Sequence, residues 1–148
     1  MCINHFVSSL ILNVFSYLYW STWGVECHII QSNMDGTNQS VIVGKNHHLN
    51  SPNAITVDKT IDHLYWTEKT SIATIGLNGR NYKQILSGLQ HPHDLAVFED
   101  YVYWTDPVEK TINRANKFTG REREKLIGKY TDPLGIVISH PLTQTEGK

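Results

Sequence analysis

The chain has 148 residues, of which 40% are hydrophobic and 18% are charged, with 13 Lys and Arg against 14 Asp and Glu. This length suits one globular domain, and a formal net charge of −1 gives no basic field for a phosphate backbone, so nucleic acid is excluded as a partner. No run reaches the ~18 consecutive apolar residues that a membrane-spanning helix needs, so contact with a membrane is expected only through segments outside this chain.

The first predicted element lies in an uncharged N-terminal run, residues 6–20. No Lys or Arg precedes this run, no small-x-small cleavage site follows it, and it leads into a Tyr-Trp pair that recurs later, so we interpret it as part of the fold rather than as a secretion signal. Residues 10–13 are the predicted first strand. Cys2 and Cys27 are too few for a disulfide framework, and their number leaves open whether they form one bridge.

Three markers recur along the chain in one order. The tryptophans of a Tyr-Trp motif lie 46 and then 38 residues apart, a proline three residues before Ile or Leu recurs at intervals of 40 and 41, and a turn glycine recurs at 43 and 41. A period of about 41 residues is typical of a four-stranded propeller blade. The copies are Tyr19-Trp20-Ser21-Thr22, Tyr65-Trp66-Thr67-Glu68 and Tyr103-Trp104-Thr105-Asp106, with Pro52, Pro92 and Pro133, and with Gly36, Gly79 and Gly120.

Short β-branched and aromatic runs within each unit predict strands rather than helices. In the second unit we expect strands at 54–58, 63–67, 71–77 and 82–86, with Asn78-Gly79 as the hairpin turn between the last two. In the third unit we expect strands at 95–98, 101–105, 111–115 and 124–127. The units therefore divide the chain into blades at about residues 1–48, 49–88 and 89–130, followed by the start of a closing blade at 131–148.

The Tyr-Trp-Thr-Asp motif, the Pro-x-x-Ile lead and the Asp-Gly or Asn-Gly turn together resemble the class B repeats of the low-density lipoprotein receptor family. In that family six repeats close into a propeller in the ectodomain of a membrane receptor. The resemblance therefore implies an all-β, partial six-bladed β-propeller of about three and a half blades. It also implies a location on the extracellular face of the plasma membrane, as part of a longer receptor, and in the endosome after uptake. The two uncovered apolar faces of an open arc predict either self-association or a longer gene product.

The chain departs from the family pattern at the motif aspartate, which is present as Asp106 but replaced by Thr22 and Glu68 in the other two copies. We interpret the recurring residues as scaffold, because Trp and Tyr bury large areas between blades while Thr and Asp bond buried backbone groups. The predicted scaffold residues are Tyr19, Trp20, Tyr65, Trp66, Thr67, Tyr103, Trp104, Thr105, Asp106, Gly36, Gly79 and Gly120.

Function in such a fold is expected in the loops. In an up-and-down blade, the connection from the second to the third strand and the connection to the next blade lie at the same end, which we call the loop face. Acidic side chains there suit a basic protein ligand, although Lys69 and Lys110 dilute them and a merely solvated rim is the alternative. For Trp23, packing over a neighbouring blade is equally open. The predicted ligand-binding residues are Trp23, Glu68, His91, His93, Asp94 and Glu109.

The eight histidines invite two further interpretations. The resemblance implies that His63, His91 or His93 releases ligand at low pH, since imidazole titrates near about pH 6.5; ordinary surface histidines are the alternative. The pair His91-x-His93 lacks a third ligand at a suitable spacing, so neither a metal nor a cofactor is expected. Asn38 begins an N-glycosylation sequon, Asn38-Gln39-Ser40, at the end opposite to the loop face.

Catalytic motifs are missing from the sequence, which has no Gly-x-Ser-x-Gly, no phosphate-binding glycine loop and no His-Glu-x-x-His. A lactonase-like propeller hydrolase would need metal ligands from all around a closed ring, so we do not expect an enzyme. The expected function is a ligand-binding module of a lipoprotein-receptor-like receptor, in endocytic uptake or signalling, that binds secreted or lipoprotein-associated proteins. A matrix-assembly propeller of the nidogen type is the alternative that the sequence leaves open.

Overall fold

The computed structural model describes residues 5–7, 16–47, 49–128 and 132–140. Regular structure in these ranges is β-strand apart from one 3-10 turn, η1 (Lys45–His47), and no helix there is long and apolar enough to cross a membrane. The strands are β1 (His5–Val7), β2 (Tyr17–Thr22), β3 (His28–Asn33), β4 (Ser40–Val43), β5 (Ile55–Asp58), β6 (His63–Thr67), β7 (Ile72–Gly76), β8 (Lys83–Leu86), β9 (Leu95–Phe98), β10 (Tyr101–Asp106), β11 (Thr111–Asn116) and β12 (Glu124–Gly128).

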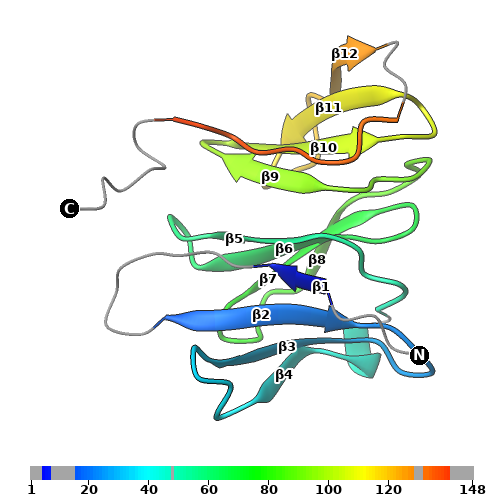
Figure 1. The fold of residues 1–148 in the computed structure, drawn as a ribbon. Coiled ribbons are helices and arrows are strands. Elements are labelled where there is room, and N and C mark those ends of the chain that lie inside the picture. Colours follow the sequence, from blue (N-terminus) through cyan, green and yellow to red (C-terminus); the bar gives the residue numbers. More distant parts are fainter. Residues whose placement is uncertain (1–4, 8–15, 48, 129–131, 141–148) are drawn as a thin grey trace.

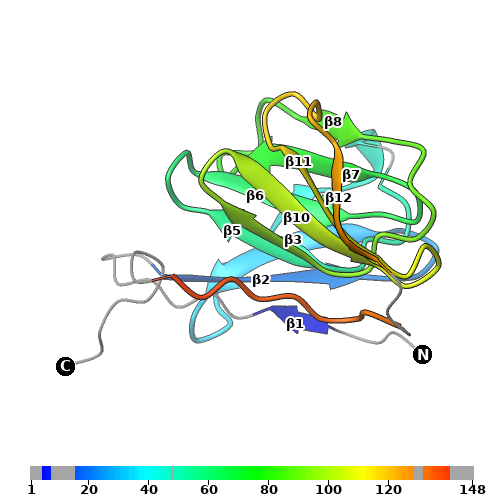
Figure 2. The same cartoon turned by 90° about the horizontal axis from the view of Figure 1, so that it is seen from above.

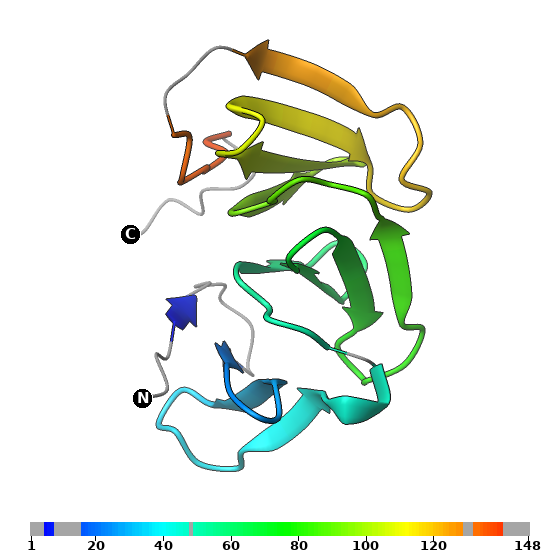
Figure 3. The same cartoon turned by 90° about the vertical axis from the view of Figure 1, so that its right-hand side faces the viewer.

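These strands form three antiparallel sheets of four strands each, in which the strands follow one another in chain order. The sheets β1–β4, β5–β8 and β9–β12 are stacked in a row (Figure 1) and rotated relative to one another when seen from above (Figure 2). Their last strands, β4, β8 and β12, lie on the convex side of an arc (Figure 3). The predicted all-β, partial propeller is therefore confirmed, and each sheet is one blade.

The strand predictions for the second and third units agree with the structure to within one residue at each end. The first unit differs, because β1 (His5–Val7) is the strand that pairs with the inner edge of β2. The prediction placed that strand at residues 10–13, which lie outside the described residues. The register gives the physical reason: Phe6 is paired with Trp20 along the ladder, as Ile55 is with Trp66 and Leu95 with Trp104, so the residue at the position opposite the motif tryptophan is of an apolar type in every blade.

The hydrophobic core is divided between the two blade interfaces. Tyr19 of the first blade packs in one cluster with Trp66 of the second, and Tyr65 of the second blade packs in another cluster with Trp104 of the third. All four side chains are buried. Burial also raises the pKa of Tyr19 and of Tyr65 to about 12. The motif tyrosine therefore faces the next blade and the motif tryptophan faces the previous one.

A threonine hydroxyl joins neighbouring blades at the loop face. Thr67 Oγ1 accepts from the Ala54 amide at 3.0 Å and donates to the carbonyl of His93 at 3.3 Å. Thr105 Oγ1 repeats this arrangement one blade later, accepting from the Asp94 amide at 3.1 Å and donating to the carbonyl of Leu134 at 3.0 Å. The segment 132–140 is thereby held against the third blade.

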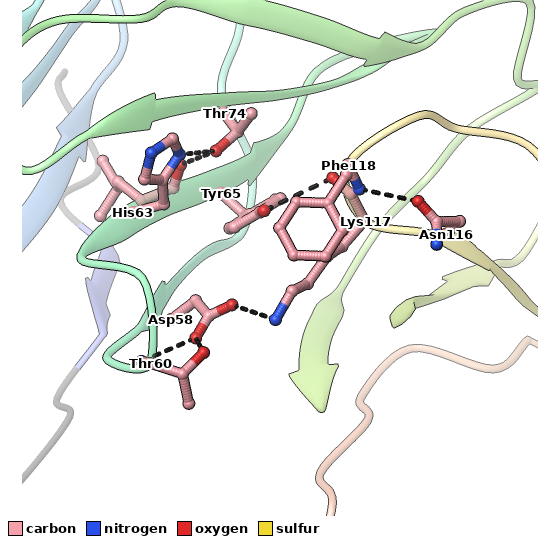
Figure 4. A network of polar contacts seen from close by, with 9 residues as sticks. Asp58, Thr60, His63, Tyr65, Thr74, Asn116, Lys117 and Phe118 are labelled. Atoms are coloured by element: carbon pink, nitrogen blue, oxygen red, sulfur yellow. Dashed lines mark hydrogen bonds and ion pairs between the residues drawn. The ribbon is translucent and has the colours of Figure 1, made fainter. Parts of the chain in front are cut away.

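At the opposite end, a buried ion pair joins the second and third blades (Figure 4). Lys117 Nζ lies 2.7 Å from Asp58 Oδ2, and both side chains are only 4% exposed. The other carboxylate oxygen of Asp58 accepts from the amide and the hydroxyl of Thr60. Loss of either charge would leave its partner buried and unpaired, at a cost of about 3–5 kcal/mol.

Candidate functional site

Loops from all three blades surround one hollow on the loop face, with a volume of about 420 Å³. The loop after β2 contributes one residue, the two loops that flank β5 and β6 contribute four, and the loop before β9 contributes three. The hollow is lined by Trp23, Ser51, Asn53, Glu68, Lys69, His91, Pro92 and His93. Four of the six predicted ligand-binding residues therefore lie together.

Trp23 contributes an exposed aromatic ring to the hollow. It follows β2 directly, and the residue is 42% exposed. The indole Nε1 donates a hydrogen bond to the carbonyl oxygen of Pro52, which belongs to the loop that enters the second blade. The ring of Trp23 is therefore anchored to the neighbouring blade and still presents surface to solvent.

His91 and His93 form the wall that the third blade contributes. Their rings are stacked, with centroids 6.3 Å apart and planes inclined by 22°. His93 Nδ1 lies 3.0 Å from the carbonyl oxygen of Leu134. Because a carbonyl oxygen only accepts, Nδ1 carries the hydrogen, and Nε2 of the neutral ring is left as an acceptor.

The backbone of His93 is fixed as firmly as its ring. Its carbonyl oxygen accepts from Asn53 Nδ2 at 2.9 Å and from Thr67 Oγ1 at 3.3 Å. Asn53 and Thr67 belong to the second blade, so both bonds cross the blade interface. The scaffold of the second blade thus positions one wall of the hollow.

Glu68 occupies the position of the motif aspartate, lines the hollow and is half-buried. Its Oε1 accepts from Trp66 Nε1 at 3.0 Å, and its carboxylate also accepts from the backbone amide of Asn50. Burial raises the pKa of Glu68, and these two hydrogen bonds partly oppose the increase. Glu68 therefore supports the scaffold and also brings an acceptor to the hollow.

The other two predicted acidic residues do not line the hollow. Asp94 accepts from the amide of Leu95 through Oδ1 and from the amide of Ile136 through Oδ2, each at 2.9 Å. Glu109 lies 3.6 Å from Arg123 Nη2 and 4.0 Å from Lys125 Nζ. Both carboxylates thus have partners on other segments.

The prediction omitted Ser51, Asn53, Lys69 and Pro92 from the ligand-binding set. Lys69 and Pro92 are next to Glu68 and His91 in the chain, whereas Ser51 and Asn53 lie in the loop that enters the second blade. Membership of a loop-face connection was the available signal. Ser51 Oγ donates to Asn50 Oδ1 at 3.3 Å, so its hydroxyl is not paired with a histidine base. No group of three or more metal-ligating side chains occurs in the described part of the chain.

Asn38, the sequon asparagine, lies in the turn between β3 and β4, at the end of the first blade opposite to the loop face. It is exposed, and its φ of 52° places it in the left-handed region. Asparagine tolerates that region better than most residues.

Comparison with known proteins places these blades in a family. The model of the low-density lipoprotein receptor repeat class B matches residues 16–59. The chain is built from class B repeats of the low-density lipoprotein receptor family. This class B chain is 33% identical over 126 residues to the vitellogenin receptor of Solenopsis invicta, an alignment that covers 83% of the chain and 7% of the relative.

Two human relatives extend the comparison. Low-density lipoprotein receptor-related protein 5 is 34% identical over 124 residues, which are 82% of the class B chain and 8% of the relative. Low-density lipoprotein receptor-related protein 4 is 45% identical over 78 residues, which are 52% of the chain and 4% of the relative. The class B chain thus spans less than a tenth of the length of these receptors.

Among solved structures, a nidogen/laminin complex contains a chain that superposes with a TM-score of 0.65 at 23% identity. The superposition covers 79% of the class B chain and 43% of the other chain. It supports the propeller fold.

Proposed function

We propose that the class B chain is a non-catalytic ligand-binding module of a lipoprotein-receptor-like cell-surface receptor, and that the hollow on the loop face is its contact site. The observation that carries this proposal is the convergence of loops from three blades on one hollow that includes an exposed tryptophan. Exposed aromatic anchors in a pocket are typical of the residues that dominate binding energy at protein interfaces.

The chemistry of the lining suits a polypeptide ligand that donates hydrogen bonds or carries positive charge. Glu68 and the Nε2 atom of His93 are acceptors, while Trp23 and the paired histidine rings offer flat surfaces for a guanidinium or an aliphatic stem. Lys69, next to Glu68 in the chain, adds one hydrogen-bond donor to the lining of the hollow. The proposed ligands are secreted or lipoprotein-associated proteins, met at the extracellular face of the plasma membrane and released in the endosome.

The test is a binding measurement with vitellogenin and low-density lipoprotein as probes, because the relatives are named after these molecules. Trp23→Ala and His91→Ala remove ring surface from the hollow, and we expect each to weaken binding at least about tenfold. Arg80→Ala, at the opposite end of the second blade, is the control and should bind normally. Failure of both probes to bind, or equal affinity of all four proteins, would contradict the proposal.

We also propose that the open faces of the arc mediate self-association with a second copy of the chain. Tyr19 and Tyr65 each pack in a cluster with the tryptophan of the next blade, whereas Tyr103 and Trp20, at the two ends of the arc, have no such tyrosine–tryptophan partner among the described residues. Light scattering after size-exclusion chromatography should give the mass of a dimer. A monomer at micromolar concentration would contradict this part of the proposal.

A further inference from the structure

The turn between β7 and β8 carries an Asn-Gly pair at the end of the second blade that lies away from the hollow. Asn78 is the only asparagine in the sequence that is followed by glycine. Its side chain is exposed, and Gly79 has a φ of 74° with no atom within 4 Å of the place where a Cβ would stand. Because glycine has no Cβ, the peptide nitrogen that follows Asn78 carries less steric hindrance than it would in any other residue.

One hydrogen bond in this turn prepares the asparagine side chain for attack. Asn78 Oδ1 accepts from the backbone amide of Arg80 at 3.0 Å. If the nitrogen of Gly79 adds to the side-chain carbonyl carbon of Asn78, negative charge develops on Oδ1, and a donor already placed there stabilises it. A second bond opposes the reaction, because the Gly79 amide donates to the carbonyl of Gly76 at 2.8 Å and must leave it first. Asn78 and Arg80 are both exposed, so this opening is local.

We propose that Asn78 is a site of spontaneous deamidation in the folded chain. The Gly79 nitrogen forms a bond to Cγ of Asn78, the C–N bond of the side-chain amide breaks, and ammonia leaves with the proton from the Gly79 nitrogen. The product is a five-membered succinimide. Water then opens either carbonyl of that ring, giving aspartate or isoaspartate, so the net reaction consumes one water and releases one ammonia.

The first blade contains an internal comparison at the equivalent turn, Asp35-Gly36. Asp35 Oδ1 accepts from the amide of Thr37 at 3.0 Å and from its hydroxyl at 2.7 Å, so the side chain is held as in Asn78. These bonds from Thr37 lower the pKa of Asp35. An ionised carboxylate is a poor electrophile with no good leaving group, so Asp35 resists the same cyclisation at neutral pH. The two turns have a similar conformation but differ in the leaving group on the side chain. A difference in their rates of cyclisation would therefore report the effect of the leaving group.

The modification changes the second blade in two ways. Either product adds one negative charge beside Arg80. Isoaspartate also adds a methylene to the main chain and shortens the side chain, which breaks the bond to the Arg80 amide and strains the β7–β8 hairpin. The turn is remote from the hollow, so this inference stands independently of the proposed ligand site.

The experiment incubates the folded chain of 148 residues in mildly alkaline buffer and digests it with trypsin, alongside a sample that was not incubated. Cleavage after Lys69 and Arg80 releases residues 70–80, in which Asn78 is the only amide side chain. We expect this peptide to gain the mass that replaces an amide with an acid and to split into two chromatographic forms. Gly79→Ala should slow the gain several-fold, and Asn78→Gln should abolish it.

Two results would overturn the proposal. One is an unchanged mass of residues 70–80 after incubation of the folded chain, while the same synthetic peptide reacts free in solution. The other is equal conversion in the Gly79→Ala chain, because the proposed attack depends on an unhindered nitrogen. Isoaspartate at Asp35 as fast as at Asn78 would contradict the role assigned to the leaving group.

Discussion

The second and third blades use the same motif position differently. In the third blade the Asp106 carboxylate is fully buried, and it accepts from the amides of Val108, Glu109 and His91. In the second blade Glu68 is half-buried and accepts from the indole of Trp66 and from the amide of Asn50. Both carboxylates accept a hydrogen bond from the loop that enters their own blade, at Asn50 or His91. Asp106 also accepts hydrogen bonds from the turn that follows β10.

The extra methylene of Glu68 explains the difference. A longer side chain reaches the tryptophan two residues earlier, whereas Trp104 Nε1 is buried without a hydrogen-bond partner among the described residues. The same methylene brings the Glu68 carboxylate to the wall of the hollow. A single substitution within a repeated motif thus converts a purely structural carboxylate into one that also faces a candidate ligand site.

The largest expected effect is that of Asp106→Ala, which leaves three backbone amides without their acceptor. We expect the free energy of unfolding to fall by roughly 3–5 kcal/mol, measured by urea denaturation. Asp106→Asn retains acceptor capacity and should cost less. If Asp106→Ala costs no more than Glu68→Ala, the contrast between the two blades is wrong.

A second contrast concerns the turn glycines of the same two blades. A Cβ on Gly120 would lie 1.9 Å from the carbonyl oxygen of Ile85 on β8, whereas a Cβ on Gly79 would meet nothing within 4 Å. Both residues have positive φ, so Gly79→Ala measures the backbone strain alone, about 1 kcal/mol. Gly120→Ala should cost about 2–3 kcal/mol more, because the turn must move off the second blade. Equal losses in thermal or urea unfolding would show that this turn is not docked.

The third prediction separates the two roles of Glu68. Glu68→Ala removes the acceptor of a buried indole and should cost about 1–3 kcal/mol. Glu68→Gln keeps an acceptor oxygen for Trp66 and removes the half-buried charge, so near neutral pH it should be as stable as the wild type or slightly more stable. A large loss in Glu68→Gln would mean that the charge itself is required.

The raised pKa of Glu68 also predicts how the stabilities of the wild type and of Glu68→Gln differ with pH. The folded chain binds the proton more tightly than the unfolded chain, so stability rises as pH falls through the interval between the ordinary and the raised pKa. Glu68→Gln has no carboxyl group at this position, so it does not gain stability in this way when the pH falls. The stability advantage of Glu68→Gln over the wild type should therefore shrink as the solution is acidified, and an advantage that grows in acid would contradict the sign.

The double variant His91→Gln, His93→Gln should have the smallest effect on stability. Its effect is expected in ligand binding instead. If the two rings gain charge on acidification, binding of the vitellogenin or lipoprotein probe should weaken between about pH 7 and pH 5 in the wild type and stay level in the double variant. A parallel pH profile in the two proteins would remove the histidines from the release step.

Much of the fold follows from the sequence because its signals are local. The period of about 41 residues, the alternation within each strand and the turn glycines require no knowledge of distant contacts, and the strands from β5 to β12 agree with them. The first blade lacks the leading proline, so nothing local marked residues 5–7 as the strand opposite Trp20.

The site is less predictable because its members acquire partners from far along the chain. Asp94 and Glu109 have the same acidic character in the sequence as Glu68, but the Ile136 amide and the side chains of Arg123 and Lys125 engage them. The reach of Glu68 to Trp66 depends on one methylene, which no periodic pattern encodes. Loop membership was predictable, whereas the pairing of each carboxylate was not.

The most direct test of the central claim is hydrogen–deuterium exchange of the chain with and without a bound probe, vitellogenin or low-density lipoprotein. The proposed site predicts slower exchange at residues 49–53, 68–69 and 91–93, with unchanged exchange in the turns around Gly36, Gly79 and Gly120 at the other end. Protection confined to those turns, with the loop-face segments unaffected, would contradict a ligand site in the hollow.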